Sequence, residues 1–147
     1  MYNYTFFHGS ALVRLIQDLR TRGIELYREN HCYLVNKKAV IYLKHSTKRI
    51  SPWHFTFSPD HLNEITTIKG ENKALFLVLI CNDDGICCLD YQEIAQLILV
   101  GNMDQNKSIR VSRSTHEKYA VSGSDGKLKY KIGNNDFPQK VLESCKR

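Results

Sequence analysis

The sequence of 147 residues lacks several signatures that would assign an activity directly. It contains no glycine-rich phosphate loop, no Walker motif and no nucleophile elbow, which excludes the most recognisable nucleotide-binding and serine-hydrolase motifs. Its longest apolar run, Ala74 to Cys81, is far shorter than the roughly 20 residues that a membrane helix needs. We therefore expect no transmembrane segment and no membrane partner.

Cysteine is present in an odd number, five, and no secretory signal precedes these residues. Their spacings fit none of the C-x₂₋₄-C patterns that let two ligands share one zinc ion. His31 with Cys32, and Cys81 with Cys87 and Cys88, are the groups that could suggest a zinc site, but buried free cysteines are the expected interpretation. A reducing, cytoplasmic location is the simplest interpretation of this cysteine usage.

Carboxylates are absent from residues 31–58, whereas Lys37, Lys38, Lys44, Lys48 and Arg49 give this stretch a local charge of about +5. The whole chain has a formal net charge of +6. A second basic stretch, residues 107–147, contains ten Lys and Arg against four Asp and Glu. This distribution favours a polyanionic partner.

Hydrophobic periodicity and turn residues predict a single α/β domain with a mixed central sheet flanked by helices. Helices are expected from Ser10 to Gly23, from Ser58 to about Gly70, from Asp90 to about Ile98, and from Asp136 onward. Strands are expected over 24–28 and 31–35 around a turn at Glu29–Asn30, and then over 39–44, 53–57, 74–81, 86–89, 108–112, 119–121 and 128–132. Residues 1–7 are expected to form a short edge strand or a segment packed on the body, and no role is assigned to them.

The order helix, three strands, helix, strand, with Lys44 ending the third strand, resembles the restriction-endonuclease-like superfamily, the PD-(D/E)XK nucleases. The resemblance covers residues 10–81 and implies a restriction-endonuclease-like core, here extended by a basic C-terminal β-hairpin. In that family an aspartate and an acid-x-lysine hold Mg²⁺ and activate water for phosphodiester cleavage. Lys44 matches the lysine, Tyr42 stands where the acid belongs, and Glu25 is the candidate carboxylate. The resemblance thus implies catalytic roles for Lys44, Tyr42 and Glu25, with Glu25 also as the Mg²⁺ ligand.

The expected function is nucleic-acid binding, with DNA favoured over RNA, by a divergent or inactive metal-dependent nuclease. Trp53 is a candidate stacking platform for bases beside Lys48 and Arg49, and burial of Trp53 in the core is the alternative. The residues expected to neutralise phosphates are Lys37, Lys38, Lys48, Arg49, Arg110, Arg113, Lys127, Lys129 and Lys131.

A non-enzymatic protein-interaction module is the alternative function. It would be an immunity or anti-defence factor, or a subunit of a complex, whose basic surface meets an acidic protein. A homodimer is also considered. The segments 44–47 and 51–53 resemble a motif of uncharacterised bacterial proteins, which implies no function.

Overall fold

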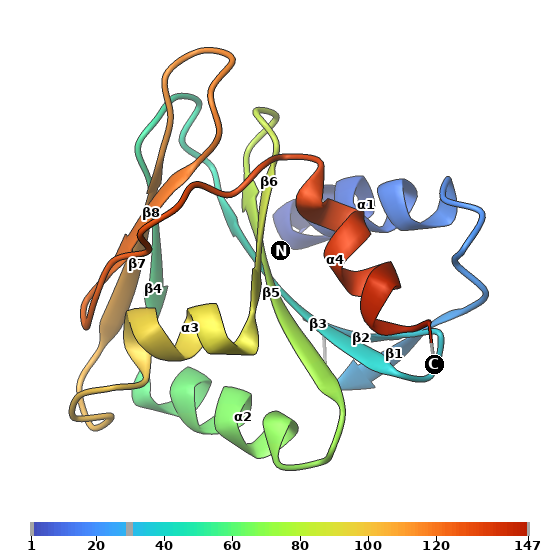
Figure 1. The fold of residues 1–147 in the computed structure, drawn as a ribbon, viewed down its shortest axis with the longest axis horizontal. Coiled ribbons are helices and arrows are strands. Elements are labelled where there is room, and N and C mark those ends of the chain that lie inside the picture. Colours follow the sequence, from blue (N-terminus) through green and yellow to red (C-terminus); the bar gives the residue numbers. More distant parts are fainter. Residues whose placement is uncertain (1, 29–30, 147) are drawn as a thin grey trace.

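In this computed structural model the described residues, 2–28 and 31–146, form two β-sheets and four helices (Figure 1). The larger sheet has the strand order β1-β2-β3-β5-β6 and the smaller one β4-β7-β8. The predicted mixed α/β domain with a mixed central sheet is therefore confirmed. The elements follow in the order α1 (Tyr2–Ile16), β1 (Ile24–Arg28), β2 (Cys32–Val35), β3 (Ala39–Ser46), β4 (Trp53–Phe57), α2 (Pro59–Lys69), β5 (Ala74–Cys81), β6 (Ile86–Asp90), α3 (Tyr91–Ile98), β7 (Lys107–Ser112), β8 (Ala120–Gly123) and α4 (Asp136–Ser144).

The larger sheet begins as an antiparallel meander of β1, β2 and β3. The predicted turn at Glu29–Asn30 lies outside the described residues. β5 runs parallel to β3, and β6 returns antiparallel to β5. A parallel neighbour needs a crossover connection, which β4 and α2 provide. β5 is buried at every position after its first, which confirms the central strand expected from its continuous apolar sequence.

Two hydrophobic clusters cover the two faces of the larger sheet. On one face, Ile41 and Leu43 of β3 pack with residues of α1 and α4. On the other face, Val40 and Tyr42 pack with residues of α2, α3 and the smaller sheet. Figure 1 shows the same layers, with α1 and α4 on one side of the larger sheet and the remaining elements on the other. The alternation of β3 side chains thus directs Tyr42 and Lys44 toward the α2 side.

The smaller sheet has one buried face and one exposed face. In β4, Trp53, Phe55 and Phe57 are buried while His54 and Thr56 are exposed. The predicted strand over 128–132 is replaced by two isolated bridges to the β8 region, Tyr119 to Ile132 and Ser122 to Lys127. The chain bends at 129–130, and a regular strand is not completed there. Residues 127–132 still lie beside β8 and extend the exposed face of the smaller sheet.

Helix α1 differs from its prediction at both ends. It begins at Tyr2 and ends at Ile16, so residues 2–7 are helical. Ser10 does not cap the helix, because its hydroxyl donates to the carbonyl of Phe7 at 2.8 Å. The buried face runs through Phe7, Ala11 and Leu15, whereas Leu19, which we expected on the apolar face, is fully exposed.

The other helices begin at the predicted positions. The Ser58 hydroxyl accepts a hydrogen bond from the backbone N–H of His61 at 3.3 Å, with Pro59 in the first turn of α2. The Asp90 carboxylate accepts one from the backbone N–H of Glu93 at 2.9 Å. α4 begins at Asp136. The starts of α2 and α3 follow from their local capping residues, whereas α4 has no side-chain cap at Asn135 and its backbone is not helical at Phe137.

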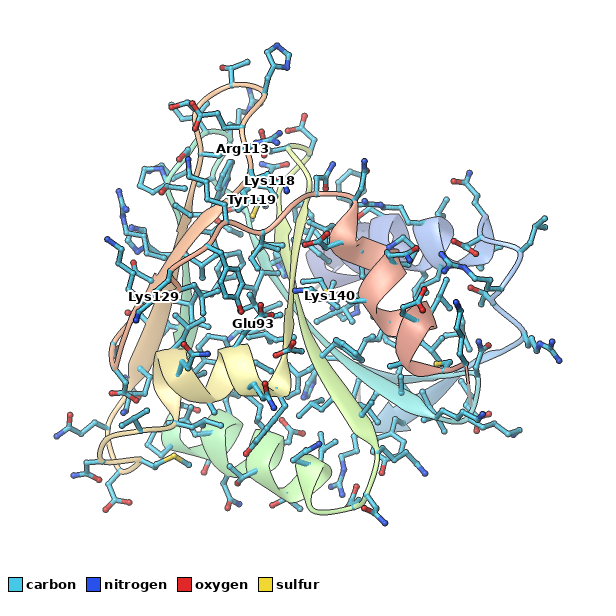
Figure 2. The ribbon with its side chains drawn as sticks, viewed as in Figure 1. Glu93, Arg113, Lys118, Tyr119, Lys129 and Lys140 are labelled. Carbon is cyan, nitrogen blue, oxygen red and sulfur yellow. The ribbon has the colours of Figure 1, made fainter. Side chains whose placement is uncertain are left out.

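Glu93 connects three parts of the chain from within the core. Its carboxylate is buried, and it accepts hydrogen bonds from the backbone N–H of Asp90 (2.9 Å), Nζ of Lys140 (2.9 Å) and the hydroxyl of Tyr130 (2.6 Å). Figure 2 shows Lys140 of α4 reaching toward Glu93 of α3. Because all three donors converge on one carboxylate, α3, α4 and the segment that carries Tyr130 are fixed relative to one another.

Candidate functional site

Lys44 lies near the end of β3 in a partly buried position. Its ammonium donates a hydrogen bond to the carbonyl of Thr56 and lies 4.4 Å from the centroid of the Phe57 ring. Burial lowers the pKa of Lys44 to about 8. Lys44 forms no ion pair with a carboxylate of the described residues. Its environment therefore favours the neutral amine more than water does.

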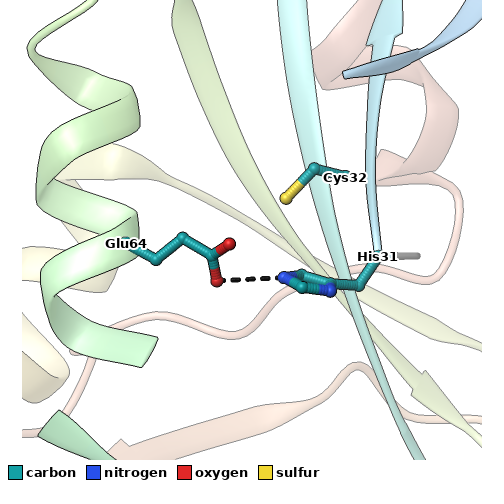
Figure 3. A group of neighbouring side chains, drawn as sticks. All are labelled: His31, Cys32 and Glu64. Atoms are coloured by element: carbon teal, nitrogen blue, oxygen red, sulfur yellow. Dashed lines mark hydrogen bonds and ion pairs between the residues drawn. The ribbon is translucent and has the colours of Figure 1, made fainter. Parts of the chain in front are cut away.

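A polar cluster occupies the same face of the larger sheet, between β2 and α2. Tyr42 is only 2% exposed, and its hydroxyl donates to Oε1 of Glu64 at 2.9 Å. Nε2 of His31 lies 2.9 Å from the same oxygen. Cys32 is the cross-strand neighbour of Tyr42, and Figure 3 shows its sulfur directed toward the His31–Glu64 pair. We call His31, Cys32, Tyr42 and Glu64 the β2–α2 cluster.

Glu64 was not predicted as a site residue. Glu64 lies on α2 between the buried residues Leu62 and Ile65, and its own side chain is partly buried. One signal was available in the sequence: α2 must cross the sheet to connect β3 with a parallel strand. Its polar side chains therefore had to pass over the face that carries Tyr42 and Lys44.

Glu25 does not lie at the position expected of a metal ligand beside Lys44. In the β1–β2–β3 register Glu25 pairs with Leu34, and Leu34 pairs with Val40. Val40 precedes Lys44 by four residues, a separation of about 13 Å along the strand. Glu25 instead forms an exposed ion pair with Lys37 at 3.1 Å. The Mg²⁺ site expected from Glu25 and Lys44 is therefore not assembled here, and the prediction for Glu25 is corrected.

The basic residues around β3 do not form one surface. Lys37 and Lys38 lie at the turn before β3, whereas Lys48 and Arg49 lie after its end. Eight strand residues separate these groups by about 26 Å. The cations expected to neutralise phosphates in this stretch are thus divided between opposite ends of β3.

Two further predicted residues have structural contacts. Trp53 is 1% exposed, and its indole N–H donates to the carbonyl of Lys48 at 2.9 Å, so neither ring face is open to a base. Trp53 is a core residue, as in the alternative interpretation. Arg113 is bound to Asp84 at 2.9 Å, and its guanidinium lies 4.8 Å from the centroid of the Tyr119 ring. Its charge is therefore compensated within the fold.

The remaining predicted cations do converge, on the exposed face of the smaller sheet. Arg110, Lys127, Lys129 and Lys131 line a shallow groove of about 340 Å³ together with Tyr130, and no carboxylate is among the described residues that line it. We call this feature the basic groove. Register explains it: Arg110 of β7 lies opposite Ser122 of β8, which in turn bridges to Lys127. Figure 2 places Lys129 at this sheet, away from α4.

The charges of the basic groove are largely uncompensated. Lys131 forms an exposed ion pair with Glu117 at 2.9 Å. Among the described residues, no carboxylate pairs with Arg110, Lys127 or Lys129. The Tyr130 side chain is 53% exposed, although Glu93 accepts its hydroxyl hydrogen, which raises the pKa of Tyr130 to about 12. The groove therefore combines three unpaired cations with one fixed aromatic ring.

Three buried thiols outside the β2–α2 cluster lie in environments that disfavour the reactive thiolate. Cys81, Cys87 and Cys88 are buried and form no disulfide, which agrees with the expectation of buried cysteines. Burial raises the pKa of Cys88 to about 12, so its thiolate is strongly disfavoured. Among the described residues, no helix combines the length and the apolar character needed to cross a membrane.

Comparison with known proteins assigns no family to this fold or to either site. No protein-family model matches the chain, and no curated protein or solved structure is significantly similar to it.

Proposed function

We propose that this protein binds nucleic acid through the basic groove. The observation that carries the proposal is the convergence of Arg110, Lys127 and Lys129, all without an ion-pair partner among the described residues, in a groove that no described carboxylate lines. Unpaired cations attract a phosphate backbone by releasing its condensed counterions. The exposed ring of Tyr130 supplies a stacking surface beside them, which is the combination that holds single strands.

The stacking role falls to Tyr130 in place of the buried Trp53. Glu93 holds the Tyr130 hydroxyl at 2.6 Å, so the ring is ordered before a ligand arrives. An ordered ring loses less conformational entropy on binding than a mobile one. Tyr130→Leu should therefore weaken binding by about 1–3 kcal/mol, the cost of losing one base–aromatic stack. Tyr130→Phe retains the ring and loses only the hydroxyl, so it should bind within a few-fold of the parent protein.

The direct test is fluorescence anisotropy with a labelled single-stranded DNA of about 20 nucleotides, the matching RNA and the duplex. The groove variant combines Arg110→Gln, Lys127→Gln and Lys129→Gln. We expect it to lose at least about tenfold in affinity at low salt. The control variant, with Lys37→Gln, Lys73→Gln and Lys146→Gln, removes the same charge elsewhere and should change affinity much less. Equal losses in both variants, or no binding by the parent protein, would contradict the proposal.

The proposal includes a restriction-endonuclease-like core. Its support is the order and direction of elements in the larger sheet: α1, the antiparallel β1, β2 and β3, then α2, then β5 parallel to β3. Lys44 near the end of β3 agrees with the same comparison. If this core also cleaves nucleic acid with Mg²⁺, Glu64 and not Glu25 is the carboxylate positioned to take part. Cleavage should then be lost in Glu64→Gln and kept in Glu25→Gln; the reverse pattern would exclude this arrangement.

The alternative, a protein-interaction module, makes a different prediction. An acidic protein partner would remain bound to the basic groove after nuclease treatment of the sample. A nucleic-acid bridge would be destroyed by the same treatment. A pull-down with the parent protein, with and without nuclease treatment, distinguishes these two outcomes. The groove variant and the control variant then show whether the basic groove is the surface involved.

A further inference from the structure

The β2–α2 cluster contains three different kinds of metal-ligating atom in one place. Nε2 of His31, Sγ of Cys32 and a carboxylate oxygen of Glu64 all lie within 4.8 Å of one another. Figure 3 shows the three side chains converging on the space between β2 and α2. Among the described residues, this is the only group of three or more potential ligands that comes together in this way.

The ligand atoms determine which metal would fit. A thiolate and an imidazole are soft or borderline ligands that suit Zn²⁺, whereas Mg²⁺ requires an oxygen shell. Tetrahedral zinc bonds of about 2.0–2.3 Å place ligand atoms roughly 3.5 Å apart. The present separations, 2.9 Å between His31 and Glu64 and up to 4.8 Å within the group, reach that geometry with shifts of about 1 Å.

The positions of the three residues are fixed by the fold. His31 lies in the turn before β2, so it is free of the strand alternation that would direct consecutive side chains to opposite faces. Cys32 is buried at the first residue of β2. Glu64 is held by the Tyr42 hydroxyl at 2.9 Å, and Tyr42 is itself buried. In metal sites, residues that do not touch the ion commonly hydrogen-bond to a ligating carboxylate and hold it in orientation.

Two of the three ligand side chains are partly exposed to solvent. The side chains of His31 and Glu64 are 27% and 21% exposed, so an ion can enter from solvent although Cys32 is buried. Three protein ligands leave a fourth position of a tetrahedral ion to water, which is the arrangement of open zinc sites. We propose that His31, Cys32 and Glu64 bind one Zn²⁺ ion, with Tyr42 orienting the Glu64 carboxylate.

The test uses the full chain, freed of metal with a chelator and then titrated with Zn²⁺, and with Co²⁺ as a spectroscopic substitute. One equivalent of zinc should bind, and cobalt should show the visible bands of a tetrahedral site with a thiolate-to-cobalt charge-transfer band. Millimolar Mg²⁺ should not displace either ion. Loss of the charge-transfer band in Cys32→Ser would identify the thiolate, because sulfur alone gives that band.

Two conservative variants keep the test independent of folding. Glu64→Gln keeps the shape of the side chain and should weaken zinc binding by at least about tenfold. Tyr42→Phe should weaken it by about 10–100-fold through loss of orientation alone. Cys145→Ser, which alters a partly exposed thiol elsewhere, is the matched control and should leave binding unchanged. Absence of zinc binding by the parent protein, or equal binding by all the cluster variants, would overturn the proposal while leaving nucleic-acid binding by the basic groove untouched.

Discussion

The ion pair between Glu93 and Lys140 gives the sharpest stability prediction. Glu93 is 3% exposed, and the Lys140 ammonium, 2.9 Å away, also donates to the carbonyl of Cys88. Lys140→Met would leave a buried carboxylate with two of its three hydrogen-bond donors. Breaking a buried pair costs about 3–5 kcal/mol. Because Asp90 and Tyr130 still donate to Glu93 and Lys140 is partly exposed, we expect a loss of about 2–3 kcal/mol.

The chain provides a closely matched control for this substitution. Lys131 pairs with Glu117 at the same distance, 2.9 Å, but both side chains are about half exposed. Lys131→Met should therefore cost no more than about 1 kcal/mol. Urea unfolding measures both, and the expected difference corresponds to a midpoint shift of roughly 1 M. Equal losses in the two variants would refute the argument that burial decides the contribution of this pair.

A double-mutant cycle isolates the pair itself. In a Glu93→Gln background the buried charge is gone, so Lys140→Met should cost much less than in the parent protein. A full and additive loss would show that Lys140 stabilises α4 through other contacts, such as the Cys88 carbonyl.

Three further predictions concern other parts of the chain. Burial, with smaller contributions from His45 and His31, lowers the pKa of His8 from 6.5 to about 4. The free energy of unfolding should therefore fall by about 3 kcal/mol as the pH falls from 6.5 to 4. In urea unfolding at a series of pH values, His8→Gln should reduce this fall. Gly123→Ala should lower the thermal midpoint by several degrees, because a Cβ there would lie 2.4 Å from the carbonyl oxygen of Leu97; an unchanged midpoint would mean that α3 shifts freely. The amine of Lys44 should titrate near pH 8 by NMR of the methylated side chain, and an ordinary value near 10.5 would show that the amine is solvated.

Much of the fold was predictable because its determinants are local. The apolar run of β5 and the capping residues Ser58 and Asp90 each fix their element without distant contacts. α1 was mispredicted because Ser10 can satisfy its hydroxyl within the helix, on the Phe7 carbonyl, as well as at a cap. Only tertiary packing, which buries Phe7 and not Leu19, decides between the two.

The two sites were predictable only in part. The residue types indicated that this protein has a basic surface for a polyanionic partner. Strand register, which the sequence does not show, places Arg110 close to Lys127, whereas Lys37 and Lys48 lie at opposite ends of β3. The β2–α2 cluster depends on the rotation of α2 over the sheet, which brings Glu64 to Tyr42. The crossover of α2 indicates which face of the sheet it covers, but the sequence spacing between residues 42 and 64 does not identify Glu64 as the residue in contact.

The salt dependence of nucleic-acid binding tests the central claim most directly. Each phosphate neutralised on a single strand contributes about −0.7 to the slope of log K against log salt concentration. If Arg110, Lys127 and Lys129 contact phosphates, the groove variant should bind with a slope about 2 smaller in magnitude than the parent protein. The control variant should keep the parent slope. A groove variant with an unchanged slope, or a control variant with an equal reduction, would contradict binding through the basic groove.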